Sequence, residues 1–386
     1  MNCRFCYKEL RKNEEFSFGK IPMTPNAIEA GLLLENGNPI EYELAITICE
    51  NCGLIQQFFS PDPSILYFRF KNEIVGEMWK RHYSKFTDFI LEQTNEHSKI
   101  LEIGGGDLSL AERLIEKGIQ GITVIEKNIK SKDYSQKINL FKGFLEDYKT
   151  ESKFDLIYSS HVMEHIDNIQ NHLKKISELL SHEGRLIFSL PDFDKWITSF
   201  STNAFSQEHP IYPTLENLSM TLEMNGFKIN RTYEFENHSI FIDAIFNVEN
   251  SKITKKFPSK ELYEKNQKIV ERFFDNFKKF GTSLRQKIGN SETYIFGANS
   301  GTQLLLKNFL DDAKIIGILD NSNLKNEKLL YGFKYNVQKP DILKNQQDIE
   351  NKKLVICTGK YVQEIKEQIT KINNKIQILT NEDIMN

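Results

Sequence analysis

The chain has 386 residues, with 50 Lys and Arg against 53 Asp and Glu, a net charge of −3 and 39% hydrophobic residues. This balance excludes the basic surplus with which proteins bind nucleic acids or acidic membrane surfaces, and the apolar content excludes wholesale disorder. Because one core seldom serves so long a chain, we expect about two or three domains, in a cytoplasmic protein without a signal peptide or a membrane span.

Four of the five cysteines form two CxxC pairs in the first part of the chain. The pairs are Cys3-Arg-Phe-Cys6 and Cys49-Glu-Asn-Cys52, and Gly53 supplies the flexible residue that the second turn needs. Thiolates spaced in this way converge on one tetrahedral ion, so the pattern predicts a structural zinc site with no position open for substrate. The alternatives are two unrelated buried thiol pairs or a redox motif, although neither pair follows a strand and opens a helix.

The next elements predict a strand, a glycine turn, a helix and a second strand. The expected ranges are helix 77–93, strand 99–103, helix 108–117 and strand 121–126. They form one right-handed βαβ unit, whose ligand crevice lies at the carboxyl ends of the strands. The glycines at 104–106 let a ligand approach the backbone closely, and Glu126 ends the second strand, where a carboxylate can bind a ribose diol.

An acidic residue precedes these glycines, in the block Glu102-Ile-Gly104-Gly-Gly106-Asp107, and the sixth position of a dinucleotide fingerprint is not glycine. The block resembles motif I of class I S-adenosylmethionine (SAM) methyltransferases, and FKGFLEDY, FDLIYSSHVMEHI and LLSHEGRLIFSLPDF continue the resemblance in order. It implies SAM as cofactor. The cofactor-binding residues that it implies are Glu102, Gly104, Gly105, Gly106, Asp107, Glu126, Lys127, Glu146, Asp147, Ser160 and His161.

His161 and His165 stand where the predicted strand 154–160 ends, close to the expected cofactor. In this fold such residues shape the cofactor pocket or cap a helix more often than they do the chemistry. A catalytic base at His165 is the alternative, which requires geometry before it is assigned.

The last part of the chain predicts a long helix and a second, smaller α/β unit. Residues 258–289 are charged and amphipathic, with Leu262, Ile269, Phe273 and Phe277 on one face. The glycine turn FGANSG then lies among expected strands at 294–296, 315–320 and 353–358. Its glycine pattern is too poor to favour an NAD domain, so we interpret this Rossmann-like sheet as a platform for the nucleotide part of a substrate. Cys357 in its last strand is expected to be a core residue.

Taken in this order, the blocks ICENCGLIQ, EIGGGD, HVMEH and FGANSG resemble the sugar C-methyltransferases of deoxysugar biosynthesis over nearly the whole chain. The resemblance implies an α/β fold, in which a class I methyltransferase Rossmann-like sheet lies between a small N-terminal zinc-binding domain and a C-terminal Rossmann-like domain. The expected boundaries are 1–75 for the zinc-binding domain, 76–255 for the methyltransferase domain and 256–386 for the linker helix and substrate-binding domain. A monomer or homodimer acting on a nucleotide-sugar-like small molecule is expected.

The segment FSQEHPIYPT, residues 205–214, aligns with the active-site loop of that family. The resemblance implies His209 as general base, Glu208 as the group that orients it and Tyr212 as a catalytic phenol. Ser206 and Gln207 replace a tyrosine and a histidine of the family pattern. A second departure lies in YFRFKNE, where Phe70 and Asn72 stand near the positions of family tyrosines and Tyr67 is offset.

Three functions remain open at this point. The resemblance implies transfer of methyl to the carbon next to a keto group of a nucleotide-linked sugar, which needs a base and a donor for the enolate oxygen. Because the phenols that would be donors are altered, O- or N-methylation of an activated sugar with the same base is the alternative. A zinc-stabilised binding module with a vestigial SAM site is the third, although the set Glu102, Gly104, Gly106 and Glu126 is intact.

Overall fold

The computed structural model describes residues 1–11, 16–32, 34–66, 76–129, 134–247, 260–356 and 359–386. Its largest sheet has the strand order β13-β14-β11-β10-β7-β8-β9, in which β14 runs antiparallel to both of its neighbours and the other pairs are parallel. The strands are β7 (Ile100–Ile103), β8 (Ile122–Ile125), β9 (Ile138–Phe141), β10 (Phe154–Ser160), β11 (Leu180–Pro191), β13 (Phe227–Phe235) and β14 (Ser239–Phe246). Its central strands are buried apolar runs, as expected for a sheet that is covered on both faces.

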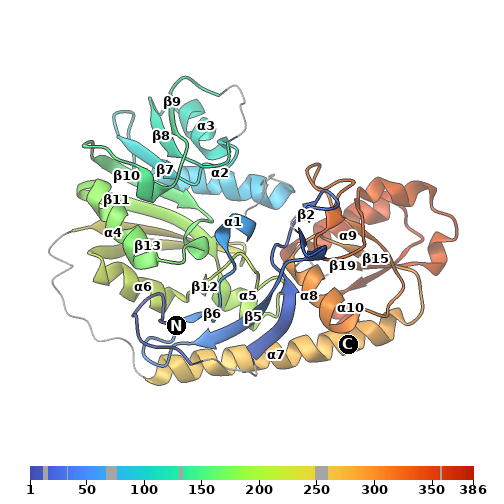
Figure 1. Ribbon diagram of the computed structural model, residues 1–386. Coiled ribbons are helices and arrows are strands. Elements are labelled where there is room, and N and C mark those ends of the chain that lie inside the picture. Colours follow the sequence, from blue (N-terminus) through green and yellow to red (C-terminus); the bar gives the residue numbers. More distant parts are fainter. Residues whose placement is uncertain (12–15, 33, 67–75, 130–133, 248–259, 357–358) are drawn as a thin grey trace.

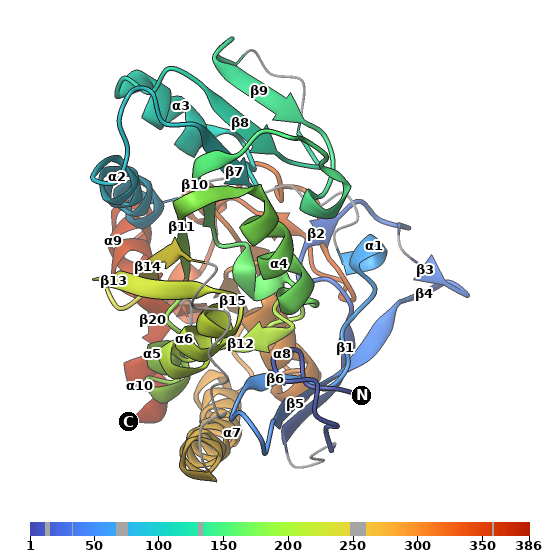
Figure 2. The same ribbon diagram turned by 90° about the vertical axis from the view of Figure 1, so that its left-hand side faces the viewer.

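Helices cover both faces of this sheet, with α2 and α4 on opposite sides of it (Figure 2). Apolar side chains at helical spacing explain the packing, since Phe86 and Ile90 of α2 face one core cluster and Leu173 and Ile176 of α4 face another. The helices of this part are α2 (Glu77–Leu91), α3 (Ser109–Glu116), α4 (Ile169–Leu179), α5 (Phe193–Thr198) and α6 (Leu215–Met224). The predicted βαβ unit is confirmed.

Two smaller sheets flank the large one. The N-terminal sheet is antiparallel, with the order β1-β5-β6-β12, and the C-terminal sheet is parallel, with the order β18-β16-β15-β19-β20. The first has β1 (Ser17–Pro22), β5 (Glu41–Ile48), β6 (Ile55–Gln57) and β12 (Ile211–Tyr212). The second has β15 (Thr293–Phe296), β16 (Ile315–Leu319), β18 (Val337–Gln338), β19 (Lys353–Ile356) and β20 (Gln377–Thr380). The predicted α/β architecture, with a second Rossmann-like sheet, is confirmed.

The remaining elements are short, apart from one long helix. They are the helices α1 (Pro63–Leu66), α7 (Lys260–Ile288), α8 (Ser300–Phe309), α9 (Val362–Ile372) and α10 (Asn381–Met385), and the strand pairs β2 (Ala27–Ile28) with β17 (Leu329–Leu330) and β3 (Leu34–Glu35) with β4 (Asn38–Pro39). Short 3₁₀ turns occupy Leu145–Asp147, Met163–His165, Pro340–Asn345, Ile349–Asn351 and Gly359–Tyr361. Among the described residues, none of the helices combines the length and hydrophobicity that crossing a lipid bilayer requires.

Strand pairing ties the three parts of the chain together. The two residues of β12 come from the predicted active-site segment, yet they extend the N-terminal sheet by pairing with β6. In the same way β2 of the N-terminal part pairs with β17 of the C-terminal part. The expected division at 1–75, 76–255 and 256–386 therefore remains a prediction. Strand pairs cross both of the expected boundaries.

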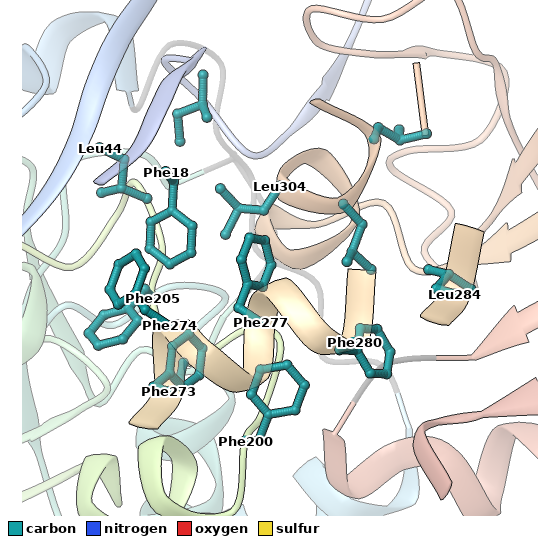
Figure 3. Packing of buried hydrophobic residues seen from close by; sticks show 14 of the residues in the cluster. Phe18, Leu44, Phe200, Phe205, Phe273, Phe274, Phe277, Phe280, Leu284 and Leu304 are labelled. Carbon is teal, nitrogen blue, oxygen red and sulfur yellow. The ribbon is translucent and has the colours of Figure 1, made fainter. Parts of the chain in front are cut away.

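Helix α7 packs against all three parts rather than spanning a gap (Figure 1). Its inward face carries Phe273, Phe277 and Phe280, which share one core cluster with Phe18 of β1 and Leu304 of α8 (Figure 3). Because the cluster contains side chains of all three parts, the helix predicted as a linker forms the centre of a common core.

Replacing Phe273 by alanine should lower the free energy of unfolding by about 3–5 kcal/mol, since the cavity left by a core phenylalanine closes only partly. Phe273 is 1% exposed, and its ring centroid lies 4.8 Å from that of Phe205 and 5.2 Å from that of Phe200. Urea unfolding measures the loss. Lys278→Ala, on the exposed face of the same helix, is the control and should change stability by less than about 0.5 kcal/mol. Equal stability of the two variants would contradict the shared core.

The helix α8 begins against a segment of the methyltransferase part. Asn299 caps it by accepting a hydrogen bond from the Thr302 amide at 3.1 Å, and Asn203 Oδ1 accepts one from the Gly301 amide, also at 3.1 Å. A Cβ on Gly301 would lie 2.3 Å from Asn203 Oδ1, so only glycine permits this approach.

Candidate active site

In the glycine turn after β7, close contacts at Gly104 and Gly105 leave no room for side chains. A Cβ on Gly104 would lie 2.5 Å from Val162 Cγ2, and one on Gly105 would lie 2.3 Å from Val124 Cγ1. Gly106 has a φ of 54°, and a Cβ there would meet no atom within 4 Å. The turn therefore offers bare backbone at Gly106, at the carboxyl edge of the parallel strands, where this fold binds its ligands.

Two carboxylates flank the turn. Glu126 follows β8, and its side chain accepts hydrogen bonds from the Gly106 amide at 3.0 Å and from the Asn128 amide at 2.7 Å. Asp107 accepts one from the Ser109 amide at 3.0 Å, which holds the start of α3. Glu126 is thus fixed beside the turn, where the ribose-binding role requires it.

Glu102 in β7 is 1% exposed, and its Oε2 has no hydrogen-bond partner. Burial raises the pKa of Glu102 to about 8, although the nearby Tyr158 hydroxyl opposes this shift. A buried carboxylate whose Oε2 has no partner among the described residues, beside an open glycine turn, fits the cationic amino-acid end of SAM, which would supply that partner. The residues present therefore fit the cofactor that the sequence predicts.

The other predicted cofactor residues lie further along the same edge. Ser160 ends β10 and shares a hydrogen bond of 2.9 Å with Ser189, while Lys127 places its ammonium group 4.4 Å from the centroid of the Phe144 ring. Glu146 and Asp147 are exposed on the turn Leu145–Asp147. Phe144, an exposed aromatic ring beside these two acids, has no counterpart among the residues predicted from the sequence.

The turn after β10 gathers two histidines and a glutamate. His161 has a φ of 53°, a left-handed conformation that non-glycine residues adopt at a cost and that recurs at functional sites. Its Nδ1 lies 3.0 Å from Glu164 Oε1, and its Nε2 lies 3.0 Å from Ser239 Oγ. Glu164 is fully buried; burial raises its pKa, but His161 and the neighbouring imidazoles prevail and the net direction is downward. Sequence reasoning missed Glu164, although its place between the histidines of HVMEH was visible.

The predicted active-site segment crosses this turn. His165 Nδ1 lies 3.0 Å from the backbone oxygen of Glu208, and the His165 and His209 ring centroids are 4.8 Å apart. Ligand atoms of Glu164, His165 and His209 all lie within 4.8 Å of one another. Glu164, from the turn after β10, is therefore grouped with His209, and Glu208 contacts this turn through its backbone oxygen.

Burial shifts the pKa values of Glu208 and His209 in opposite directions. Burial holds the pKa of His209 at about 3, so its imidazole is neutral at physiological pH. Burial also raises the pKa of Glu208, against the opposing effects of His165 and of Lys325 from the C-terminal part. Glu208 thus lies where the methyltransferase and C-terminal parts meet.

Three further residues of the segment hold it in place. Tyr212 is fully buried, and its hydroxyl donates to the Ser206 carbonyl oxygen at 2.9 Å. Gln207 is also fully buried and donates to the Pro22 carbonyl oxygen at 3.1 Å and to the Gln303 side chain at 2.7 Å. Because the Tyr212 hydroxyl is buried and hydrogen-bonded within the segment, Tyr212 has a structural role and is not part of the proposed catalytic set. Tyr67, Phe70 and Asn72 lie outside the described residues.

The four predicted zinc ligands come together at one end of the N-terminal sheet. Cys3 Sγ lies 3.5 Å from Cys52 Sγ, Cys6 Sγ lies 3.5 Å from Cys49 Sγ, and all four sulfurs lie within 4.8 Å of one another. Tetrahedral zinc with bonds of about 2.3 Å separates its sulfurs by about 3.8 Å, so the cluster fits such an ion. Cys357 lies outside the described residues.

Comparison with known proteins gives a sequence match and several distant similarities. Residues 76–232 match the family described as "Methyltransferase domain". A ubiquinone biosynthesis O-methyltransferase of Rickettsia bellii is 22% identical over 171 residues, which cover 38% of this chain and 68% of that protein. Similar solved structures include a SAM-dependent methyltransferase of Mesorhizobium loti, at 13% identity and a TM-score of 0.35 over 41% of this chain and 96% of that one. A magnesium protoporphyrin IX methyltransferase of Synechocystis with bound SAM has 15% identity and a TM-score of 0.35, over 47% and 89%.

The family match, the strand order of the large sheet and the glycine turn with its two carboxylates agree with one another. They account for the cofactor end of the site, whereas Glu208 lies close enough to Lys325 of the C-terminal part to feel its charge. The chain therefore carries a class I, SAM-dependent methyltransferase domain, and the protein is a methyltransferase.

Proposed function

We propose that the protein transfers the methyl group of SAM to a nucleotide-linked sugar, at the carbon next to a keto group. The observation that carries this proposal is the meeting of the segment 205–214 with the turn after β10, where Glu208 and His209 lie at the carboxyl edge of the methyltransferase sheet. This fold binds its cofactor at the same edge of the sheet, so a basic group there lies on the side from which the methyl group is transferred.

The chemistry needs a base, a stabilised oxygen and an in-line approach. The carbon acid gives up its proton to the pair Glu208 and His209, of which the family resemblance favours His209. The electron pair left on that carbon then forms the new bond to the methyl carbon, and the pair of the breaking carbon–sulfur bond stays on sulfur. The residues proposed to hold the cofactor are Glu102, Gly104, Gly105, Gly106, Asp107, Glu126, Lys127, Glu146, Asp147, Ser160 and His161.

A place for the rest of the substrate is supported by a cavity between the two Rossmann-like parts. It has a volume of about 160 Å³ and is lined by residues that include Trp196, Asn203, His238, Tyr361 and Asn381. Aromatic and amide side chains can stack on and hydrogen-bond to sugar and base rings. This supports the C-terminal sheet as the platform for the nucleotide.

O- or N-methylation of an activated sugar is the second candidate. Among the described residues, the family's phenol positions offer no free hydroxyl, since Tyr212 is bonded to Ser206 and position 206 itself is serine. A hydroxyl or amine acceptor needs no enolate donor, only a base. The relative from Rickettsia bellii is an O-methyltransferase, which agrees with this candidate.

Incubation with ¹³C-methyl-labelled SAM and a panel of keto- and amino-sugar nucleotides tests both candidates. We expect a labelled C-methyl product, whose carbon shift in the NMR spectrum differs from those of O-methyl and N-methyl groups. A labelled O- or N-methyl product would favour the second candidate. Transfer to none of the sugars by a protein that binds SAM would contradict both.

SAM affinity should rise with pH up to about 8. The free protein holds a proton on Glu102, because burial raises the pKa of this group to about 8, whereas a bound ammonium group favours the carboxylate. Binding then releases a proton, and below about pH 8 each pH unit should strengthen binding by up to about tenfold. Calorimetry in two buffers of different ionisation enthalpy measures the released proton.

The matched control for this titration is Glu102→Gln. It should bind SAM about 10- to 100-fold more weakly, since a charged hydrogen bond is lost, and without pH dependence. A wild-type affinity that stays constant between about pH 6 and pH 8 would mean that Glu102 does not meet the charged end of the cofactor.

A further inference from the structure

Beside the acid–base pair, the turn after β10 and the segment 205–214 converge on one buried space. The ligand atoms of Glu164, His165 and His209 lie within 4.8 Å of one another there. We propose that these three side chains bind a divalent metal ion, distinct from the ion of the four cysteines, and that this ion holds an oxygen atom of the methyl acceptor. The role in catalysis rests on the proposed function; the binding of the ion does not.

Glu164 supplies the first reason for a cation. It is fully buried, and neither of its carboxylate oxygens has a hydrogen-bond partner among the described residues. The Nδ1 atom of His161 lies 3.0 Å from Oε1 and forms an ion pair with it when the imidazole is protonated. Removing a carboxylate from water without hydrogen bonds is costly unless a cation faces it. His209 Nδ1 is also buried without a partner. Glu164, which His161 pairs at one oxygen, and the Nδ1 atom of His209 therefore both offer lone pairs to a cation.

His165 is held in the form that binds metals. A carbonyl oxygen only accepts hydrogen bonds, so the contact of 3.0 Å between His165 Nδ1 and the Glu208 oxygen places the proton on Nδ1. In this tautomer the lone pair is on Nε2, and an Nδ1–H that donates to a backbone carbonyl is a common outer contact of metal-binding histidines.

A second outer contact orients the carboxylate. His161 lies between Glu164 and Ser239, with 3.0 Å to each, and its left-handed backbone fixes the ring there. Such an arrangement, in which an imidazole holds a ligand carboxylate, makes a metal site selective in geometry.

The ligand set indicates the kind of ion and its use. Two imidazoles and one carboxylate suit Zn²⁺, Mn²⁺ or Fe²⁺ and leave coordination positions open, unlike a site of four cysteines. Methyl transfer involves no electron transfer, so the ion acts as a Lewis acid on the acceptor's oxygen. The ion would supply the oxygen contact that Tyr212 does not offer, because the Tyr212 hydroxyl donates to the Ser206 carbonyl oxygen. With the ion bound, His209 is a ligand instead of the base, and Glu208 of the proposed pair accepts the proton.

Titration with Mn²⁺ of protein that carries one equivalent of zinc, which the four cysteines bind first, is followed by electron paramagnetic resonance and tests the site without any substrate. Mn²⁺ prefers nitrogen and oxygen ligands and leaves thiolate sites to zinc. We expect one bound Mn²⁺ per wild-type chain, and binding at least about tenfold weaker in each of Glu164→Gln, His165→Asn and His209→Asn. His182→Asn, which changes an exposed histidine, should bind Mn²⁺ as the wild type does.

Two results would overturn the inference. One is a wild-type protein that binds no Mn²⁺. The other is equal Mn²⁺ binding by the wild type, His165→Asn and His209→Asn. Both histidines are only half buried, and SAM binding by the two variants reports whether they are folded. The proposed function fails separately. If the protein binds Mn²⁺ through these residues but methylates none of the sugars, the metal site is supported and the proposed substrate class is wrong.

Discussion

Cys52→Ser should remove the metal of the N-terminal part and strongly destabilise the protein. Structural zinc contributes about 10–16 kcal/mol of binding free energy in small zinc domains, and that energy is also folding energy. The cysteine turn here is bonded to distant helices. Cys52 O accepts from Asn217 Nδ2 in α6 at 2.6 Å, and Gly53 O accepts from Asn266 Nδ2 in α7 at 2.7 Å. Loss of the ion should therefore loosen contacts with both helices.

Metal analysis and thermal unfolding measure this prediction together. The wild type should hold about one zinc ion at the cysteines, and the variant none there, with a lower unfolding temperature. Cys357→Ser, outside the two pairs, should retain the zinc. A Cys3→Ser variant that folds and unfolds like the wild type, without zinc at this site, would rule out a structural ion.

His209→Asn and Glu208→Gln should each reduce turnover by about 10²–10⁴-fold while leaving SAM affinity unchanged, because a positioned acid–base group contributes on that scale. Both residues lie at the meeting point of the segment 205–214 with the turn after β10, whereas the glycine turn lies at β7. The rate of methyl transfer to whichever sugar nucleotide of the panel proves to be an acceptor gives the turnover, and calorimetry gives the SAM affinity.

The variant Tyr212→Phe separates catalysis from loop structure. Among the described residues, the Tyr212 hydroxyl makes hydrogen bonds only to the segment's own backbone and to Gln57, so its removal should lower stability more than it lowers the rate of the chemical step. Near-normal turnover of His209→Asn would return the whole segment to a structural role.

The cofactor half of the site could be predicted because its signals are local. The acid of β7, the glycines and Glu126 fall within one βαβ unit of about 30 residues, whose geometry is set by strand–turn–helix rules. The two CxxC pairs are local in the same sense, since each knuckle presents its own two sulfurs. The fold class followed from the repetition of these units along the chain.

The acceptor half could not be predicted in the same way, because long-range packing decides it. Nothing near Glu208 indicates that its own backbone oxygen, rather than its carboxylate, meets His165. The pairing of β12 with β6, and of Gln207 with Pro22 and Gln303, joins residues that are far apart in the sequence. Glu164 became a candidate only when its burial was known, since an exposed glutamate at that position would need no partner.

The start of α8 has a consequence for how a nucleotide can bind. In Rossmann-like sheets the amides at such a helix start receive phosphate groups, but here the Gly301 amide already donates to the Asn203 carboxamide. A phosphate that bound there would have to displace Asn203. Phosphate binding at the start of α8 and release of Asn203 from the Gly301 amide are therefore thermodynamically linked. Asn203 precedes Glu208 and His209 by only a few residues. Binding of a nucleotide phosphate to the C-terminal sheet would thereby free the segment that carries Glu208 and His209 from one of its contacts.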